Sequence, residues 1–208
     1  MRRLLCVTMS VSKGYDRGLQ GVPAPGFTAV YGGSFNPPHL GHQMACLYLL
    51  EALGAEEVWL VPAFDHPFGK KLASFEHRLA MCEAMVDVFA KGVCVKDAEK
   101  RANASGRTYD LLRHLKEKHP HQRLALVIGS DILAETHKWH RWEDIVQEFE
   151  VVLLGRQGYP HPEFPHLVDL PPISSSAVRD GVAQGATPHH TLPSAVSKYI
   201  QRHGLYRA

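Results

Sequence analysis

Two histidines, His39 and His42, stand three positions apart at the end of the segment Tyr31-Gly32-Gly33-Ser34-Phe35-Asn36-Pro37-Pro38-His39-Leu40-Gly41-His42. This spacing places both imidazoles on one face of a helix. The first turn of a helix also carries backbone N–H groups that have no partner within the helix. Together these donors predict an anion site, and the glycines before them let a ligand come close to the backbone.

Two further segments carry polar groups where a strand ends or a helix begins. Gly129-Ser130-Asp131 follows an apolar run, and Ile173-Ser174-Ser175-Ser176-Ala177-Val178-Arg179 opens a late helix. A helix N-terminus favours anions, and an arginine can bind phosphate oxygens through two parallel hydrogen bonds. A plain N-cap is the other interpretation of the serines. In a doubly wound sheet ligands bind beyond the carboxyl ends of the strands, so the three segments are expected to meet there.

The histidine segment resembles the motif of the nucleotidyltransferase superfamily, in which two histidines line the triphosphate of a nucleotide. Its elements are present as Gly33, Phe35, Pro37, His39, Gly41 and His42. The segment from Ile173 to Arg179 is similar to the phosphate motif of the same superfamily. No Walker loop and no Gly-x-Gly-x-x-Gly fingerprint occurs, which disfavours kinases and dehydrogenases.

From about Phe27 to the C-terminus the order of motifs resembles the bacterial nicotinate-nucleotide adenylyltransferases. Besides those above, the shared motifs are Thr108-Tyr109-Asp110, Trp139, Gly155 to Pro160 and Gly204 to Arg207. The resemblance implies an enzyme of NAD biosynthesis, in which the phosphate of nicotinate mononucleotide attacks the α-phosphorus of ATP. Nicotinamide mononucleotide and phosphopantetheine are left open as acceptors, and a nucleotide-binding module without turnover is a further alternative.

The resemblance also implies roles for single residues. His39, His42 and Arg179 are the expected catalytic residues, and Asp131 is expected at the ribose of the adenosine. The expected ATP-binding residues are Gly32, Gly33, Ser34, Phe35, His39, His42, Gly129, Asp131, Ile173, Ser174, Ser175 and Arg179. The residues expected at the acceptor nucleotide are Asn36, Lys70, Lys71, Thr108, Tyr109 and Trp139.

The loop Pro62 to Lys71 departs from the family pattern Pro-Pro-His-Arg, whose arginine helps to hold the acceptor. Lys70 and Lys71 are the nearby cations, together with His66. We therefore expect Lys70 or Lys71 to take over the acceptor's phosphate, against the alternative that both are solvated loop charges.

The transfer brings two polyanions together, so charge neutralisation matters more than a general base. Mg²⁺ is expected to arrive with ATP rather than in a protein metal site, because this ion usually keeps its waters and the phosphates as ligands. The i, i+3 pairs His39/His42 and His137/His140 would also suit a metal-dependent hydrolase, but neither has an evident third ligand nearby.

Apolar runs and helical patterns alternate along the chain. Strands are predicted at 27–31, 58–61, 93–95, 124–128 and 151–154, with an edge strand at 166–170. Helices are predicted at 39–53, 75–90, 108–118, 132–136, 142–149, 174–184 and 193–203, and 96–106 is expected to be a loop. This order indicates an α/β fold, a Rossmann-like doubly wound parallel sheet in one nucleotidyltransferase domain at 27–208. Residues 1–26 are an extension whose role the sequence does not assign.

Composition sets the remaining expectations. The 208 residues suit one domain, and 23 basic against 21 acidic residues give a net charge of +2, which favours neither nucleic acid nor membrane partners. The expected partners are ATP and a pyridine mononucleotide, and homo-oligomer formation is left open. Four cysteines without Cys-x-x-Cys spacing favour a reducing cytoplasm.

Overall fold

The computed structural model describes residues 23–64, 72–101, 107–160, 168–186 and 190–207. Six parallel strands form one sheet in the order β3-β2-β1-β4-β5-β6, which confirms the predicted doubly wound α/β fold. The strands are β1 (Phe27–Gly33), β2 (Ala55–Pro62), β3 (Val93–Val95), β4 (Leu124–Gly129), β5 (Glu150–Arg156) and β6 (Asp169–Leu170). The order reverses between β1 and β4, so the loops after these two strands diverge and leave a crevice.

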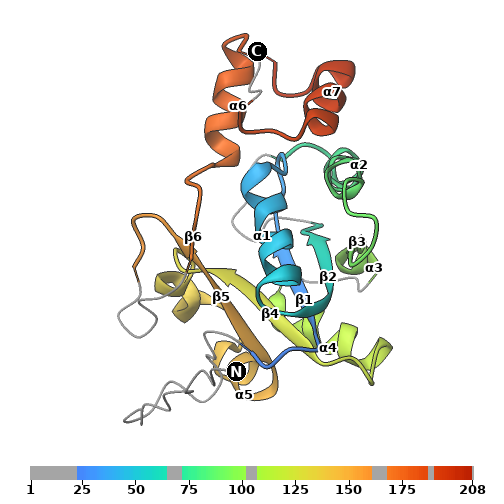
Figure 1. Cartoon of the computed structure of the whole chain (residues 1–208), viewed down its shortest axis with the longest axis vertical. Helices are drawn as coiled ribbons and strands as arrows, with labels where there is room; N and C mark the ends of the chain where they lie inside the picture. The colour runs from blue at the N-terminus through green and yellow to red at the C-terminus, as the bar shows by residue number, and fades with distance from the viewer. Residues whose placement is uncertain (1–22, 65–71, 102–106, 161–167, 187–189, 208) are drawn as a thin grey trace, which may run out of the picture.

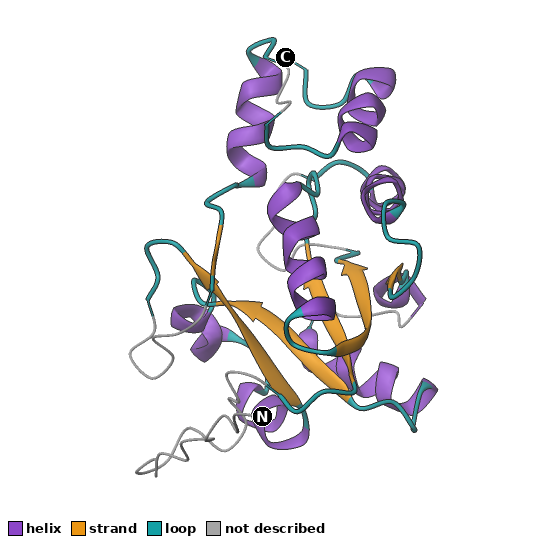
Figure 2. Ribbon diagram, viewed as in Figure 1, coloured by secondary structure: helices purple, strands orange, loops and turns teal. Residues whose placement is uncertain are grey.

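Helices cover both faces of the sheet (Figure 1). They are α1 (Leu40–Glu51), α2 (Phe75–Val86), α3 (Ala98–Arg101), α4 (Thr108–Lys118), the 3₁₀ helix η1 (Leu133–Lys138), α5 (Trp142–Glu148), α6 (Ser175–Ala183) and α7 (Ser194–His203). In Figure 2 α6 and α7 lie beyond the arrowheads of the central strands, next to the start of α1. Within the described ranges, no helix combines the length and apolar character that crossing a bilayer requires.

The two faces of the sheet have separate cores because successive side chains of a strand point to opposite sides. Ala29, Leu60 and Val127 face one core, which is closed by α1, α2, α6 and α7. Val30 and Leu126 face the other, which is closed by α4 and α5. The strands β1, β4 and β5 are buried on both faces over most of their length, which explains why the sequence shows them as continuous apolar runs.

Most predicted element boundaries agree with the structure to within a few residues, and two predictions are wrong. The helix predicted to reach residue 90 ends at Val86, and residues beyond it form turns before Gly92. Residues 98–101, predicted to be loop, form the short helix α3, which buries Ala98 and Glu99. Ser74 and Ser174 are the N-caps of α2 and α6, since Ser74 accepts from the N–H of His77 and Ser174 accepts from that of Ala177.

Candidate functional site

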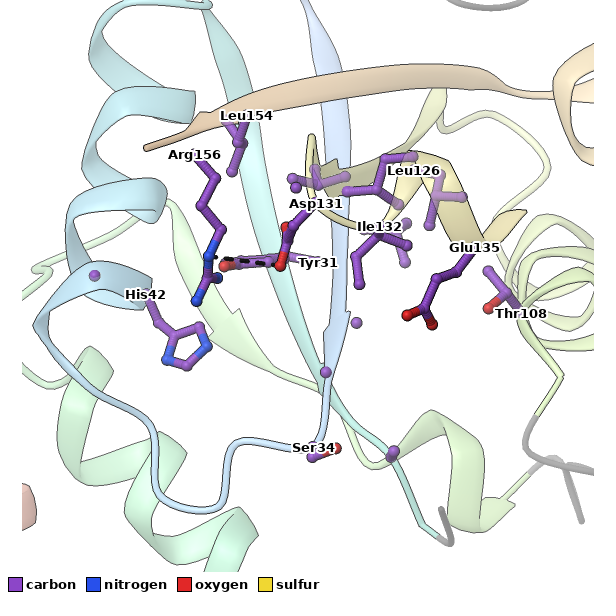
Figure 3. Close-up of a pocket in the computed structure, with 18 of the residues that line it drawn as sticks. Tyr31, Ser34, His42, Thr108, Leu126, Asp131, Ile132, Glu135, Leu154 and Arg156 are labelled. Atoms are coloured by element: carbon purple, nitrogen blue, oxygen red, sulfur yellow. Dashed lines mark ion pairs between the residues drawn. The ribbon is translucent and has the colours of Figure 1, made fainter. Parts of the chain in front are cut away.

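A cavity of about 740 Å³ opens at the carboxyl ends of β1 and β4, at the reversal of strand order. This volume is typical of small-molecule sites. The predicted residues that line it are Gly32, Gly33, Ser34, His39, His42, Thr108, Gly129, Asp131, Trp139 and Ile173. The structure therefore brings together the ends of two strands, the first turn of α1, the start of α4 and the segment before α6 (Figure 3).

His39 and His42 stack against each other, with ring centroids 3.7 Å apart and ring planes 25° from parallel. The backbone N–H of His39 donates to Nδ1 of His42 at 3.1 Å. Because this nitrogen accepts, the neutral His42 ring carries its proton on Nε2. Nδ1 of His39 is buried and has no hydrogen-bond partner among the described residues. Hydrogen-bonding capacity is thus left over for a ligand.

Both histidines are neutral at pH 7. Burial, with a smaller contribution from the positive charge of Arg156, lowers the pKa of His39 to about 4. Burial also holds the pKa of His42 well below its usual value, with smaller contributions from His39 and Arg156. The pair consequently offers uncharged N–H donors, and an anion bound beside it would raise both pKa values.

The residues around the pair explain its geometry. Phe35 is 2% exposed and sits edge-on to the ring of His42 at 4.9 Å, so it supports the histidine from the core. A Cβ at Gly41 would come within 3.1 Å of the ring of His39, which is closer than most Cβ contacts, so a side chain there would push against that ring. The absence of a side chain at Gly129 likewise leaves room for Asp131, because a Cβ on Gly129 would clash with Oδ1 of Asp131.

Arg156, at the end of β5, belongs to the segment Gly155 to Pro160 that carries the family resemblance, but it was not among the predicted site residues. The side-chain Nε of Arg156 lies 3.5 Å from Oδ2 of Asp131, and the backbone N–H of Arg156 donates to the hydroxyl of Ser130. Figure 3 shows this side chain reaching from β5 between Asp131 and His42. A cation directly after an apolar strand was the available signal, but its proximity to Asp131 depends on the pairing of β4 with β5.

Four other residues with charged side chains that line the cavity were also missed: Glu99, Arg107, Glu135 and Lys138. Figure 3 shows Glu135 and Thr108 on the side of the cavity away from His42. Glu99 accepts the N–H of Phe64 at 2.7 Å, and burial raises the pKa of its carboxyl group. These residues come from η1, α3 and the start of α4, which only the fold brings together.

The remaining predicted residues do not line the cavity in this structure. Tyr109 is 6% exposed, donates its hydroxyl to Glu148 at 2.8 Å, and lies under the guanidinium of Arg141. Phe35, Asn36, Ser174, Ser175 and Arg179 are likewise absent from its lining. Lys70 and Lys71 lie outside the described residues.

Arg179 and Ser175 connect the start of α6 with the loop between β1 and α1. Arg179 donates from Nη1 to the carbonyl of Asn36 at 2.8 Å and from Nη2 to the hydroxyl of Ser176 at 3.1 Å. The hydroxyl of Ser175 donates to the carbonyl of Pro37 at 2.8 Å. A guanidinium has five N–H donors, and the bonds of Arg179 to the described residues use two of them, so among these residues donors are left for an anion.

Comparisons with known proteins agree with this geometry. A cytidylyltransferase-like family model matches residues 30–181. A probable nicotinate-nucleotide adenylyltransferase of Anaeromyxobacter dehalogenans is 47% identical over 182 residues, which cover 86% of this chain and 96% of that protein. The corresponding Myxococcus xanthus protein is 41% identical over 180 residues, 86% of this chain and 93% of its own length.

A solved structure is also similar. The Plasmodium falciparum nicotinic acid mononucleotide adenylyltransferase, complexed with NaAD, superposes with a TM-score of 0.75 at 25% identity. The match covers 86% of this chain and 96% of that one.

Proposed function

The chain belongs to the cytidylyltransferase-like family, and to the nicotinate-nucleotide adenylyltransferases within it, and we propose that it transfers the adenylyl group of ATP to nicotinate mononucleotide. An oxygen of the acceptor's phosphate forms the new bond to the α-phosphorus of ATP. The bond between that phosphorus and the oxygen that bridges it to the β-phosphate breaks. The products are the deamido dinucleotide of NAD biosynthesis and pyrophosphate. The observation that carries the proposal is the stacked pair His39 and His42 in the cavity at the switch point.

Two anions must approach each other in this reaction, so the site has to reduce their repulsion and hold them in line. Neutral His39 and His42 suit the ATP phosphates, because N–H donors can bind anionic oxygens without a prior charge of their own. Arg156 supplies permanent positive charge close to both rings. As charge grows on the leaving pyrophosphate, these donors stabilise it more strongly than they stabilise bound ATP.

The start of α6 completes the proposed phosphate site. The N–H groups near Ser174 and Ser175 and the spare donors of Arg179 are assigned to the β- and γ-phosphates. Hydrogen bonds from Arg179 and Ser175 to Asn36 and Pro37 support this assignment, because they hold α6 next to the histidine loop. Asp131 is assigned to the ribose of the adenosine, at the carboxyl end of β4.

The pyridine nucleotide is assigned to the side of the cavity lined by Thr108 and Trp139. Trp139 is half-buried and packs edge-on against Trp142 with centroids 5.8 Å apart, so its ring has a fixed orientation. Tyr109 supports this wall from the core rather than through its hydroxyl, which is bound to Glu148. Lys70 or Lys71 is still our proposed partner for the acceptor's phosphate.

Mg²⁺ fits this site as an ion carried by the nucleotide. Among the described residues, no three His, Cys, Asp or Glu side chains are grouped so as to hold a metal ion. Asp131 is paired with Arg156, and Glu99 is bound to the N–H of Phe64. When bound, the ion would neutralise charge on the β- and γ-phosphates.

The test is incubation of the purified chain with ATP and Mg²⁺ and one acceptor at a time, followed by chromatography of the products and measurement of pyrophosphate. The acceptors are nicotinate mononucleotide, nicotinamide mononucleotide and phosphopantetheine. We expect the deamido dinucleotide to form with the highest kcat/KM. A clear preference for either other acceptor would overturn the substrate assignment, and absence of pyrophosphate with all three would overturn the enzymatic proposal.

A further inference from the structure

Arg78, in the first turns of α2, has a charged side chain that is only 1% exposed. Buried arginines usually pair with carboxylates. Among the described residues Arg78 makes no ion pair, and its hydrogen bonds go to three backbone carbonyl groups instead. Nε donates to Ala73 at 3.0 Å, Nη1 to Ser34 at 2.9 Å and Nη2 to Phe64 at 3.2 Å.

These carbonyl groups come from two separate parts of the chain. Ser34 belongs to the loop between β1 and α1, whereas Phe64 and Ala73 flank residues 65–71 in the connection from β2 to α2. A guanidinium is planar and its donors have fixed directions. One side chain therefore sets the positions of both loops relative to each other.

Phe64 and Ala73 are bound through their N–H groups as well. The N–H of Phe64 donates to Oε2 of Glu99 at 2.7 Å, and that of Ala73 donates to Oδ1 of Asn36 at 3.0 Å. Asn36 lies two residues beyond Ser34, so Ala73 contacts the histidine loop twice, once directly and once through Arg78. Both polar backbone groups of each flanking residue are thus held.

Two of the three carbonyl groups held by Arg78 are at one wall of the cavity, since Ser34 lines it and Phe64 follows Ala63, which also lines it. Ser34, Ala63 and Glu99 line this wall, while Arg78 does not reach the cavity. The N–H of Ala63 also donates to the carbonyl of Gly33 at 2.9 Å, which joins the same two loops at their start. A shift of either loop would move the wall relative to His39 and His42.

We propose that Arg78 is a positioning residue for the transfer reaction, which fixes the wall formed by Ser34, Ala63 and Glu99 relative to the histidine pair. The role rests on the proposed function. Arg78 contacts no substrate and takes part through the three carbonyl groups. Without it, the two anions would still bind, but they would be in line less often.

The variants Arg78→Met and Arg78→Lys test this role. Methionine fills space but donates no hydrogen bond, whereas lysine keeps the charge and can bind some of the carbonyl groups. Misplacement of reacting groups by about 1 Å can cost on the order of 10² in rate. We expect kcat of folded Arg78→Met to fall by about this factor, KM for ATP to change far less, and Arg78→Lys to recover part of the loss.

Arg123 provides a matched control at the opposite end of the sheet. It also holds a loop through carbonyl groups, those of Ala24 and Pro25, and it pairs with Glu150 at 2.6 Å. Arg123→Met should lower the melting temperature and leave kcat and both KM values unchanged. Hydrogen exchange measured by mass spectrometry adds a readout other than turnover, in which Arg78→Met speeds exchange in peptides containing the amides of Phe64 and Ala73.

Turnover of the native chain tests the proposed function. The role of Arg78 is tested by the ratio of variant kcat to native kcat, measured with the acceptor that the native chain uses. A different result is that both Arg78 variants keep the native kcat and show a lowered melting temperature, as expected for Arg123→Met. That result would show that Arg78 has a structural role only. Unchanged exchange at Phe64 and Ala73 would overturn the proposal independently of turnover. If Arg78→Met does not fold, Arg78→Lys carries the same comparisons.

Discussion

The charge of His39 and His42 is set by where their rings lie. Stacked at 3.7 Å, within reach of Arg156, and largely removed from water, the rings are held neutral in the folded protein. In the unfolded chain both would titrate near 6.5. This difference links the stability of the protein to pH.

The stability of the protein should therefore fall as the pH drops from about 6.5 toward 4. In this window the unfolded chain binds a proton at residue 39 that the folded chain excludes, so unfolding is favoured. For His39, whose pKa is lowered to about 4, the loss between pH 7 and 5 is about 2 kcal/mol. Urea unfolding of the native chain and His39→Asn at both pH values measures this loss as the difference between the two proteins. An equal pH dependence in both would show that His39 is not the group responsible.

His42→Ala should leave the fold in place and lower turnover steeply. Its Nε2–H is proposed to stabilise charge that grows on the leaving group, and loss of one such donor in other enzymes costs on the order of 10² to 10³ in kcat. Steady-state kinetics at saturating ATP, with circular dichroism as a check on folding, measures the effect. Near-normal turnover would remove His42 from the mechanism.

Arg179→Lys should weaken ATP binding about tenfold, because an ammonium group cannot keep the hydrogen bond to Asn36 and also bind a phosphate in a planar arrangement. The KM of the pyridine nucleotide should stay close to its native value. Calorimetry with ATP and with the acceptor separates the two substrates. Equal losses for both, together with a lower melting temperature, would indicate that Arg179 is structural.

At the scale of elements, the loop between β1 and α1 is held by parts of the chain that are far away in sequence. α6 reaches it through Ser175 and Arg179, and the C-terminal Tyr206 donates its hydroxyl to Oδ1 of Asn36 at 2.8 Å. The N–H of Leu40 donates to the carbonyl of Thr191 in the connection before α7. The histidine loop therefore depends on the C-terminal elements for its shape.

Tyr206→Phe should lower stability by about 1 kcal/mol, the usual contribution of one such hydrogen bond. Because Asn36 would still accept from Ala73, turnover should fall less than in the Arg78 variants. Thermal denaturation and kinetics measure both effects. Tyr159→Phe, at a side chain that is 53% exposed, serves as the control and should change neither. A melting temperature unaffected by Tyr206→Phe would contradict the proposed link.

The elements were largely predictable because each has a local cause. Buried parallel strands appear as continuous apolar runs, and Ser74 and Ser174 cap the helices that follow them. α3 was missed because Ala98-Glu99-Lys100-Arg101 is polar and too short to show a helical period. The end of α2 was placed too late because Val88, Phe89 and Ala90 continue the apolar composition after the helix has ended at Val86.

The site was predictable only in part, for a physical reason. His39 and His42 are neighbours in sequence, so their spacing alone indicated a shared face. Arg156 and Glu99 enter the cavity through strand pairing and helix docking, which no local pattern encodes. Arg78 was hidden inside an ordinary amphipathic helix, since nothing in its neighbours shows that its partners are carbonyl groups of two distant loops.

At the scale of the whole molecule, the described fold is anchored from residue 23 onward. Arg123 holds the carbonyl groups of Ala24 and Pro25, and the N–H of Gly26 donates to the carbonyl of Gly54 at 3.0 Å. These contacts fix the entry to β1 at the end of the sheet away from the cavity. The nucleotidyltransferase domain is accordingly proposed to span residues 27–208.

Deletion of residues 1–22 should leave kcat and both KM values close to native, because the contacts that fix β1 are retained. Kinetics of the truncated chain with ATP and nicotinate mononucleotide, beside its melting temperature, measures the result. The matched change is Arg123→Met, which disturbs the entry itself and should lower the melting temperature. A large loss of turnover in the truncated chain would assign residues 1–22 a part in the reaction.

The central position of β1 governs the order in which the newly made chain can fold. Of the described strands β1 is the first to leave the ribosome, yet one of its two edges pairs with β4, and the hydroxyl of Thr28 donates to the side chain of Gln122, 94 positions later. Until β4 has been synthesised, the partial sheet of β1, β2 and β3 has an open apolar edge of the kind that promotes aggregation. The nascent chain must therefore be kept from associating with other chains while the residues between β3 and the end of β4 are translated, and the cavity cannot form before β4 emerges.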